Sequence, residues 1–134
     1  MNNTILVKIT MPSETIFEGE AKMINLPGSE GVFGVLPGHA KLIAKITIGC
    51  ISVFLEDHEK KFFIYDGIAQ ITPLEVNIVS EFAVDLEGQN KNQILSKITN
   101  LNTEREQAQE NSLEAKLLEN AITKYNSLLD FMGN

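Results

Sequence analysis

Residues 26–40 have the sequence LPGSEGVFGVLPGHA, in which two proline–glycine pairs enclose a short apolar segment. Glycine allows backbone angles that other residues avoid, while proline fixes φ and removes an N–H donor. The pairs Pro27-Gly28 and Pro37-Gly38 therefore each predict a sharp reversal of the chain. We expect residues 32–36 between them to form a short strand at one end of a sheet, beside turns on which a partner can dock.

The glycines of this stretch recur every three residues, at Gly28, Gly31 and Gly34, a spacing that invites comparison with a phosphate-binding loop. Such a loop closes with Lys-Ser or Lys-Thr at the start of a helix. Here Gly38 is followed by His39-Ala40 and then by an alternating, strand-like segment. The sequence therefore favours glycines that serve turns in a β domain.

Short apolar segments with a period of two lie on both sides of this stretch. This period is typical of strands, and turn signals such as Asp66-Gly67 separate the segments. Many short strands with such spacing predict an antiparallel sandwich or barrel. The expected strands cover residues 5–10, 15–18, 22–26, 32–36, 42–48, 51–55, 62–65, 68–71 and 76–79. The residues expected to share one face of the strand 42–48 are Leu42, Ala44, Ile46 and Ile48.

The composition of the chain changes at Gly88, because residues 89–132 contain neither glycine nor proline. Apolar residues recur there with helical spacing in two stripes, within 94–108 and within 113–132. A polar interruption separates the stripes. Two antiparallel helices joined by a short turn are therefore predicted.

The start of the second helix is predicted at Asn111, because Asn111 and Glu114 resemble a capping box. The fold class expected is α+β, with an antiparallel β-sandwich domain at 1–88 and a two-helix hairpin domain at 89–134. A lone hairpin has little core, so its stripes either bury each other, lie against the sandwich, or bind another protein.

Composition narrows the class of protein. The chain has 134 residues, 43% of them hydrophobic, and a net charge of −7, which argues against nucleic acid or anionic lipid as the main partner. Cys50 is the only cysteine and is expected to be a small buried residue of a strand. No segment reaches 18 apolar residues, and no signal or transit peptide opens the chain, so we expect no membrane insertion.

Residues suited to catalysis or metal binding are scarce. The two histidines, His39 and His58, lie in separate predicted turns, and one cysteine leaves no metal-ligand spacing. A Gly-x-Ser-x-Gly motif is absent from the sequence. We therefore predict no catalytic residues, no metal and no cofactor, and hence a protein that is not an enzyme.

The order of features resembles the ε subunit of bacterial F-type ATP synthase over nearly the whole chain. The specific part of the match is the run GSEG followed by GVLPGHA within 28–40, and YDGIA at 65–69 and VNIV at 76–79 follow in the same order. The helical hairpin matches in pattern only. The resemblance implies a β-sandwich followed by two helices.

The resemblance also implies partners. The subunit belongs to the rotor's central stalk, where the sandwich clamps the γ subunit and rests on the ring of c subunits, on the cytoplasmic face of the bacterial inner membrane. His39 maps to a turn with a structural or γ-facing role. The residues that map to the loop facing the c ring are Ser29, Glu30, Gly31, Val32 and Phe33.

The hairpin of this family folds against the sandwich or extends towards the catalytic α and β subunits, and the extended form blocks ATP hydrolysis. The residues that the resemblance assigns to these regulatory contacts are Lys116, Leu117, Lys124 and Leu128. The second helix carries two lysines and three acidic residues here, so strong electrostatic docking is not expected.

Some family members bind ATP through an Ile-Asp-x-x-Arg-Ala motif that enters the first helix. Here the matching positions begin with Val84 and Asp85, but Gly88 stands at the arginine position. Without the guanidinium the bidentate partner for phosphate is lost, so we predict no nucleotide site. The alternative to a rotor subunit is a β-sandwich binding module whose helical tail mediates self-association.

Overall fold

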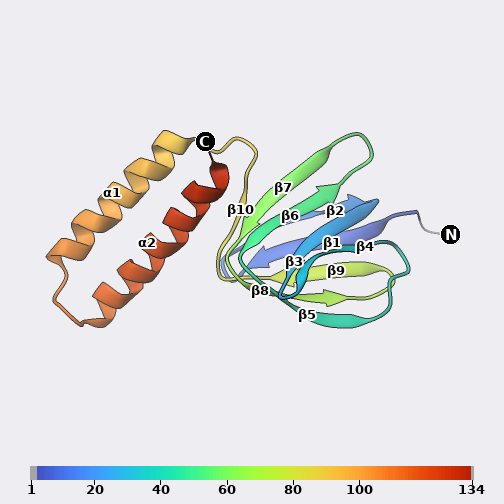
Figure 1. Ribbon diagram of the computed structural model, residues 1–134, viewed down its shortest axis with the longest axis horizontal. Helices are drawn as coiled ribbons and strands as arrows, with labels where there is room; N and C mark the ends of the chain where they lie inside the picture. Colours follow the sequence, from blue (N-terminus) through green and yellow to red (C-terminus); the bar gives the residue numbers. More distant parts are fainter. Residues whose placement is uncertain (1–2, 134) are drawn as a thin grey trace. The chain divides into compact units, whose positions relative to one another are not determined.

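The computed structural model describes residues 3–133, which divide into two compact units with their boundary between Glu87 and Gly88 (Figure 1). Within the described residues, the first unit contains ten strands and the second contains two helices. The strands are β1 (Ile5–Met11), β2 (Glu14–Ala21), β3 (Met23–Gly28), β4 (Gly31–Val35), β5 (Leu42–Ile46), β6 (Gly49–Phe54), β7 (Glu59–Ile64), β8 (Gly67–Ile71), β9 (Glu75–Val79) and β10 (Ala83–Asp85).

The strands form one continuous sheet in the order β10-β7-β6-β3-β5-β8-β9-β1-β2, with β4 paired to β3 beside this path. Neighbours run antiparallel except β1 and β9, which are parallel and align Leu6 with Glu75. The sheet folds over on itself, so that β10 approaches β2 from the other end of the order. This architecture confirms the predicted β-sandwich, in a form close to a closed barrel.

One apolar core fills the space between the two halves of the sheet, because every second side chain of a strand points to the same side. Ile5, Val7 and Ile9 of β1 are completely buried, and so are the inward residues of β3, β6 and β9. The Phe62 ring lies at 5.3 Å from the Phe17 ring, a tilted aromatic contact inside this core. The sandwich therefore has a core of its own.

Three details of the strands differ from the sequence prediction. Strand β10, of three residues, was not predicted. Strand β2 does not stop at Gly19 but continues to Ala21, because Gly19 keeps its pairing with Val7. Of the predicted face of β5, only Ile46 is fully buried, whereas Leu42 and Ile48 are exposed. Strand β5 joins β3 only at the pair of Ile46 with Gly28, so its other end extends beyond the core.

The second unit consists of α1 (Lys91–Gln107) and α2 (Leu113–Met132), which confirms the predicted helices. Asn90 caps α1, because its side chain accepts hydrogen bonds from the backbone N–H groups of Asn92 and Gln93. The helices run antiparallel, since the start of α1 bonds to the end of α2 through Lys91 and Gly133.

The predicted cap of α2 was wrong by one residue. Ser112 is the N-cap, and its hydroxyl accepts from the Ala115 N–H at 3.0 Å. Asn111 instead adopts a left-handed conformation with φ of 62°, which asparagine tolerates better than most residues. The tight turn therefore uses Asn111 for its reversal and leaves the capping to the next residue.

Candidate interaction surfaces

The loop assigned to the c ring is the tip of the β3–β4 hairpin. Gly28 pairs with Gly31 across a two-residue connection made by Ser29 and Glu30, and Gly31 has a φ of 119° that favours glycine. The hydroxyl of Thr47 donates to the Pro27 carbonyl oxygen at 3.2 Å. The base of the loop is therefore fixed by hydrogen bonding, while Ser29, Glu30 and Gly31 are exposed.

The two apolar residues of this loop behave differently. Val32 is 70% exposed, whereas the Phe33 ring is partly buried and packs against the core. A Cβ atom at Gly28 would lie only 2.9 Å from the Phe33 ring, so the glycine makes room for it. Phe33 therefore supports the loop from below, and Glu30 and Val32 form its accessible tip.

His39 does not lie with the other predicted loop residues, because it follows the opposite end of β4. Its backbone N–H donates to the Leu36 carbonyl oxygen at 3.1 Å, and Gly38 N–H donates to the Pro73 carbonyl oxygen at 2.9 Å. The imidazole Nδ1 is 2.7 Å from the Ala40 carbonyl oxygen. These bonds attach the Pro37-Gly38 turn to the β8–β9 turn, which gives His39 a structural setting.

Exposed apolar residues gather on the outside of β5, β8 and β9, a surface that we call the outer face and define by Ile43, Ile68 and Val79. Ile43 is 71% exposed and Ile68 is 56% exposed. Ile68 pairs directly with Val79 on β9 and with Lys45 on β5. Ile43 pairs with Gln70, so it is a diagonal neighbour of Ile68 and not its direct partner. Solvent-facing strand positions are normally polar, so three exposed branched residues on neighbouring strands make this face a candidate interaction surface.

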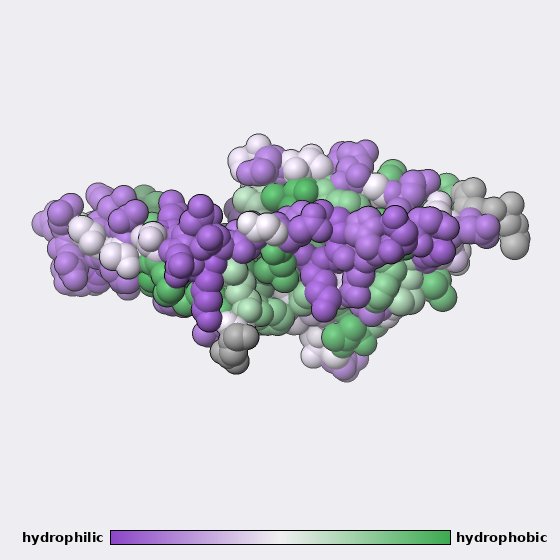
Figure 2. Space-filling model, turned by 90° about the horizontal axis from the view of Figure 1, so that it is seen from above, coloured by the Kyte–Doolittle hydropathy of each residue, from purple (hydrophilic) through white to green (hydrophobic). Residues whose placement is uncertain are grey.

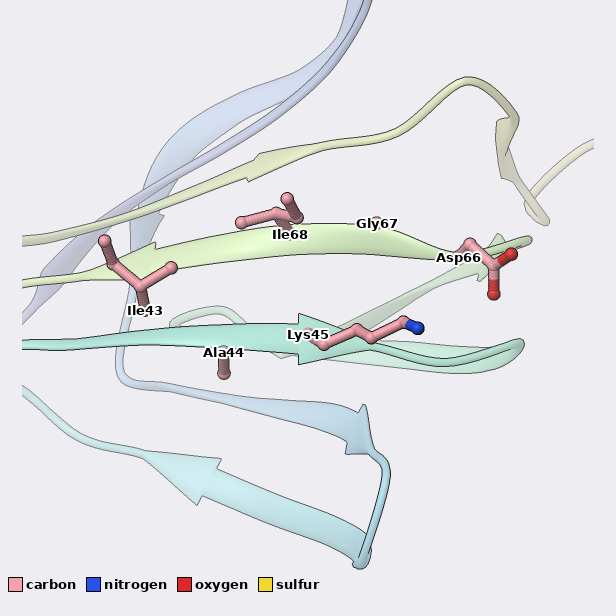
Figure 3. Close-up of a pocket in the computed structure, with 6 residues that line it drawn as sticks. All are labelled: Ile43, Ala44, Lys45, Asp66, Gly67 and Ile68. Atoms are coloured by element: carbon pink, nitrogen blue, oxygen red, sulfur yellow. The ribbon is translucent and has the colours of Figure 1, made fainter.

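A shallow groove of about 410 Å³ runs along this outer face between β5 and β8. Figure 3 shows Ile43 and Ile68 on the adjacent strands, with the Lys45 side chain reaching along β5 towards the end at which Asp66 lies. The groove is lined by Ile43, Ala44, Lys45, Asp66, Gly67 and Ile68. Its apolar floor with one cation and one anion at its end suits a protein partner.

The β3–β4 loop borders the outer face. Ala44 and Lys45, which line the groove, also line a second hollow together with Gly28–Phe33. Figure 2 shows apolar side chains reaching the surface between hydrophilic ones on the face that it displays. The loop and the outer face therefore form one adjoining surface, on which two partners can sit side by side.

Sequence reasoning did not identify the outer face. The available signal was that Ile43, Ile68 and Val79 lie out of phase with the buried residues of their own strands, which include Ile46 and Ile71. Such a signal becomes meaningful only once the pairing of β5, β8 and β9 is known. The pairing makes Ile68 the direct partner of Val79 and the diagonal neighbour of Ile43, and the sequence contains no local feature that reports this.

The remnant of the nucleotide motif lies on β10. Val84 pairs with Phe63, and the Asp85 carboxylate accepts from Lys60 Nζ at 2.9 Å and from the Glu87 N–H at 2.9 Å. The hydrogen bond to Asp85 raises the pKa of Lys60 above its ordinary value. The carboxylate is thus occupied by contacts within the sandwich unit.

The residues assigned to regulatory contacts lie along α2. Lys116 and Leu117 are exposed and Lys124 is half-buried, but Leu128 is fully buried. Leu128 could meet another subunit only after a rearrangement of the hairpin.

No group of three or more His, Cys, Asp or Glu side chains among residues 3–133 is arranged to hold a metal ion. Neither helix in the described part of the chain has the length and apolar character needed to cross a membrane.

Comparison with known proteins places the chain among rotary ATP synthase subunits. The model of the family described as "ATP synthase, Delta/Epsilon chain, beta-sandwich domain" matches residues 4–86. The ATP synthase epsilon chain of Rickettsia felis is 38% identical over 104 residues, covering 75% of this chain and 93% of that one. The epsilon chain of Rickettsia bellii is 40% identical over 104 residues, covering 75% and 96%.

Two solved structures share the fold. A chain of the Euglena gracilis mitochondrial ATP synthase, in a structure of its OSCP/F1/c-ring, matches with a TM-score of 0.64 and 21% identity, covering 96% of this chain and 81% of that one. A chain of the Tetrahymena thermophila mitochondrial ATP synthase, in a central stalk and c-ring structure, matches with a TM-score of 0.53 and 10% identity, covering 96% and 92%.

Proposed function

The chain belongs to the epsilon-chain family of ATP synthases, and on this premise we propose that it couples the γ subunit to the c ring within the rotor. It is a non-catalytic member of the complex. The proposal rests mainly on the outer face, where Ile43 and Ile68 are exposed on the paired strands β5 and β8. Burial of these side chains against a partner would be favourable, because it removes apolar surface from water.

We propose that γ covers the outer face. Burial of Ile43 and Ile68 would supply the apolar centre of the interface, and Lys45 and Asp66 at the end of the groove would fix its orientation. Interface centres are typically apolar with charged groups at the rim. The arrangement of the groove agrees with that pattern.

The β3–β4 loop is proposed to rest on the c ring. Glu30 is the only charged residue of the loop and stands exposed at its tip beside Val32. Because the loop adjoins the outer face through Ala44 and Lys45, one surface can hold γ and the ring together. The complex would then lie peripherally on the cytoplasmic face of the bacterial inner membrane.

The helical hairpin is proposed to inhibit ATP hydrolysis when it extends towards the α and β subunits. In that form Leu117 and Lys116, already exposed, and Leu128, now buried, would all face other subunits. Two packings of one apolar stripe make a bistable element. For this inhibition we propose two domains, the sandwich at 1–88 and the helical hairpin at 89–134.

The test uses the matching catalytic complex stripped of this subunit, with ATP hydrolysis and binding measured together. The full chain is added to one sample, and a chain ending at Gly88 is added to another. We expect both chains to bind and only the full chain to slow hydrolysis. Binding by both without inhibition would restrict the function to coupling.

The interface is tested in the same complex with the double variant Ile43→Asp/Ile68→Asp. We expect binding to weaken by at least about 100-fold, because two carboxylates would be buried without partners. Thr15→Asp, at an exposed position of the edge strand β2, is the matched control and should bind like the unchanged chain. If neither the full chain nor the truncated chain binds at all, the self-associating module becomes the better interpretation.

A further inference from the structure

All three basic residues of α1 reach across to α2. Lys91 Nζ donates to the Gly133 carbonyl oxygen at 2.7 Å, and Lys97 Nζ lies 6.0 Å from the centre of the Tyr125 ring. Arg105 completes the series at the end of α1 nearest the turn. The cations therefore come from one helix, and their partners are two residues of α2, its C-cap Gly133 and Glu110 of the turn.

Arg105 makes the strongest of these links and is the only arginine of the chain. Its Nε donates to Glu119 Oε2 on α2 at 3.1 Å, and its Nη2 donates to Glu110 Oε1 in the turn at 2.9 Å. One guanidinium thus joins the end of α1, the turn and α2. Charge-assisted bonds of this kind are about twice as strong as neutral ones.

Large apolar side chains are poorly buried at the same end of the hairpin. Leu101 is the last buried residue of α1, and Arg105 occupies the next position on that face, one turn later. On α2 the small residue Ala115 is completely buried, but the neighbouring leucines are not, since Leu113 is 72% exposed and Leu117 is 59% exposed. Near the turn, the ion pairs of Arg105 therefore lie beside a small apolar contact at Ala115, where a coiled-coil seam would have larger apolar side chains.

We infer that Arg105 is a latch that holds the turn end of the hairpin closed, and that ionic strength controls its release. The Arg105 side chain is 25% exposed, while Glu110 and Glu119 are more open to solvent, so salt can reach the pairs. The helices can then separate from the turn end, where Leu113 and Leu117 are exposed and the fully buried apolar residue of α2 is the small Ala115. That this regulates the inhibitory arm rests on the proposed function.

The latch is tested on the isolated full chain by hydrogen exchange of the backbone amides in the first half of α2. For the unchanged chain we expect about fivefold faster exchange when salt rises from about 0.02 M to about 0.5 M. Arg105→Gln should exchange at the fast rate at both salt concentrations. Peptides from β1 and β6 serve as the internal reference for the sandwich.

Two further variants separate the latch from a general effect of charge. Lys116→Gln removes one positive charge from an exposed lysine of α2 that takes part in none of the ion pairs found among residues 3–133, and should exchange like the unchanged chain. Glu119→Gln should reproduce most of the Arg105→Gln effect, and the double variant should add little to either.

The inference is overturned if Arg105→Gln exchanges within twofold of the unchanged chain at low salt, or if it keeps the full salt response. It is equally overturned if Lys116→Gln has the same effect as Arg105→Gln. Because exchange is measured without other subunits, a failed latch differs from a failed function. The latter would appear only as absent binding or absent inhibition in the hydrolysis assay.

Discussion

The sandwich and the hairpin bury their apolar residues to different degrees. Core residues of the sandwich such as Ile51 and Phe62 have no exposed surface, whereas Ile94, Ile98 and Leu101 of α1 keep 8–9% of theirs. Several strands of the sandwich are also held by hydrogen bonds to strands far away in sequence, such as β1 to β9 and β3 to β6, while the helices satisfy most backbone groups locally. We therefore expect the sandwich to be the more stable unit and the hairpin to be the unit that rearranges more easily.

This difference suits a stalk subunit whose parts have separate tasks. A coupling element must transmit force without deforming, which a close-packed interior provides. A regulatory arm must release its packing at low cost, which few buried residues and exposed ion pairs provide. The following experiments test this division, beginning with the largest expected effect.

The sharpest contrast lies between Phe62→Ala and Ile98→Ala. Removal of the Phe62 ring leaves a cavity beside Phe17 and should cost about 3–5 kcal/mol of unfolding free energy. Ile98→Ala should leave the unfolding of the sandwich unchanged and lower only the helical signal. Urea unfolding followed by near- and far-ultraviolet circular dichroism measures both. Equal loss of sandwich stability in the two variants would contradict the division.

Phe33→Ala tests whether the loop is part of the rigid unit. Because the ring packs beneath the loop, we expect a loss of about 3 kcal/mol. Val32→Ala, at the exposed neighbouring position, is the control and should cost less than about 0.5 kcal/mol. Thermal melts compare the two. A neutral Phe33→Ala with defective proton pumping would instead mean that this ring faces the c ring.

A chain ending at Gly88 tests whether the sandwich needs the helices. We expect it to fold with a free energy of unfolding within about 1 kcal/mol of that of the sandwich in the full chain, because its core is complete. Denaturant titration of the truncated and full chains gives the comparison. A truncated chain that aggregates or melts without a cooperative transition would show that the hairpin stabilises the sandwich.

The smallest expected effect belongs to the ion pair of Lys60 with Asp85, which fixes β10 at the end of the sandwich. Lys60→Met should lower stability by about 0.5–1 kcal/mol at neutral pH. Since folding raises the pKa of Lys60, the contribution is complete below its ordinary value of 10.5 and is lost as pH rises through the higher, folded value. The difference between the two chains should therefore shrink above that pH. A difference that does not change with pH would assign the effect to packing instead.

The parts of the fold that were predicted correctly are those with a local signal. Ile5, Val7 and Ile9 alternate within one strand, and the two helices have uninterrupted helical stripes. The Pro37-Gly38 turn was equally readable, since Gly38 adopts a positive φ. The Pro27-Gly28 pair instead ends β3, and the positive φ of that reversal falls on Gly31. Local chemistry determined these features, so the sequence alone was sufficient.

The missed parts depend on partners distant in sequence. Strand β10 has three residues, and it exists because Asp85 meets both Phe62 and Lys60 across the sheet. The outer face likewise needs the register of Ile68 with Val79, and the latch needs Arg105 to meet Glu119. Periodicity cannot report which strands become neighbours, so these features could be found only in the structure.

The parallel pairing of β1 with β9 has a consequence for how the protein folds. It joins Leu6 to Glu75, so the sheet cannot close until about 70 residues of chain have been brought into a loop. High contact order slows folding, whereas neighbouring helices meet within microseconds to milliseconds. On refolding from denaturant, the hairpin should thus form before the sandwich. The helical hairpin, which is expected to be the less stable unit, would therefore form first, and the more stable sandwich would form last.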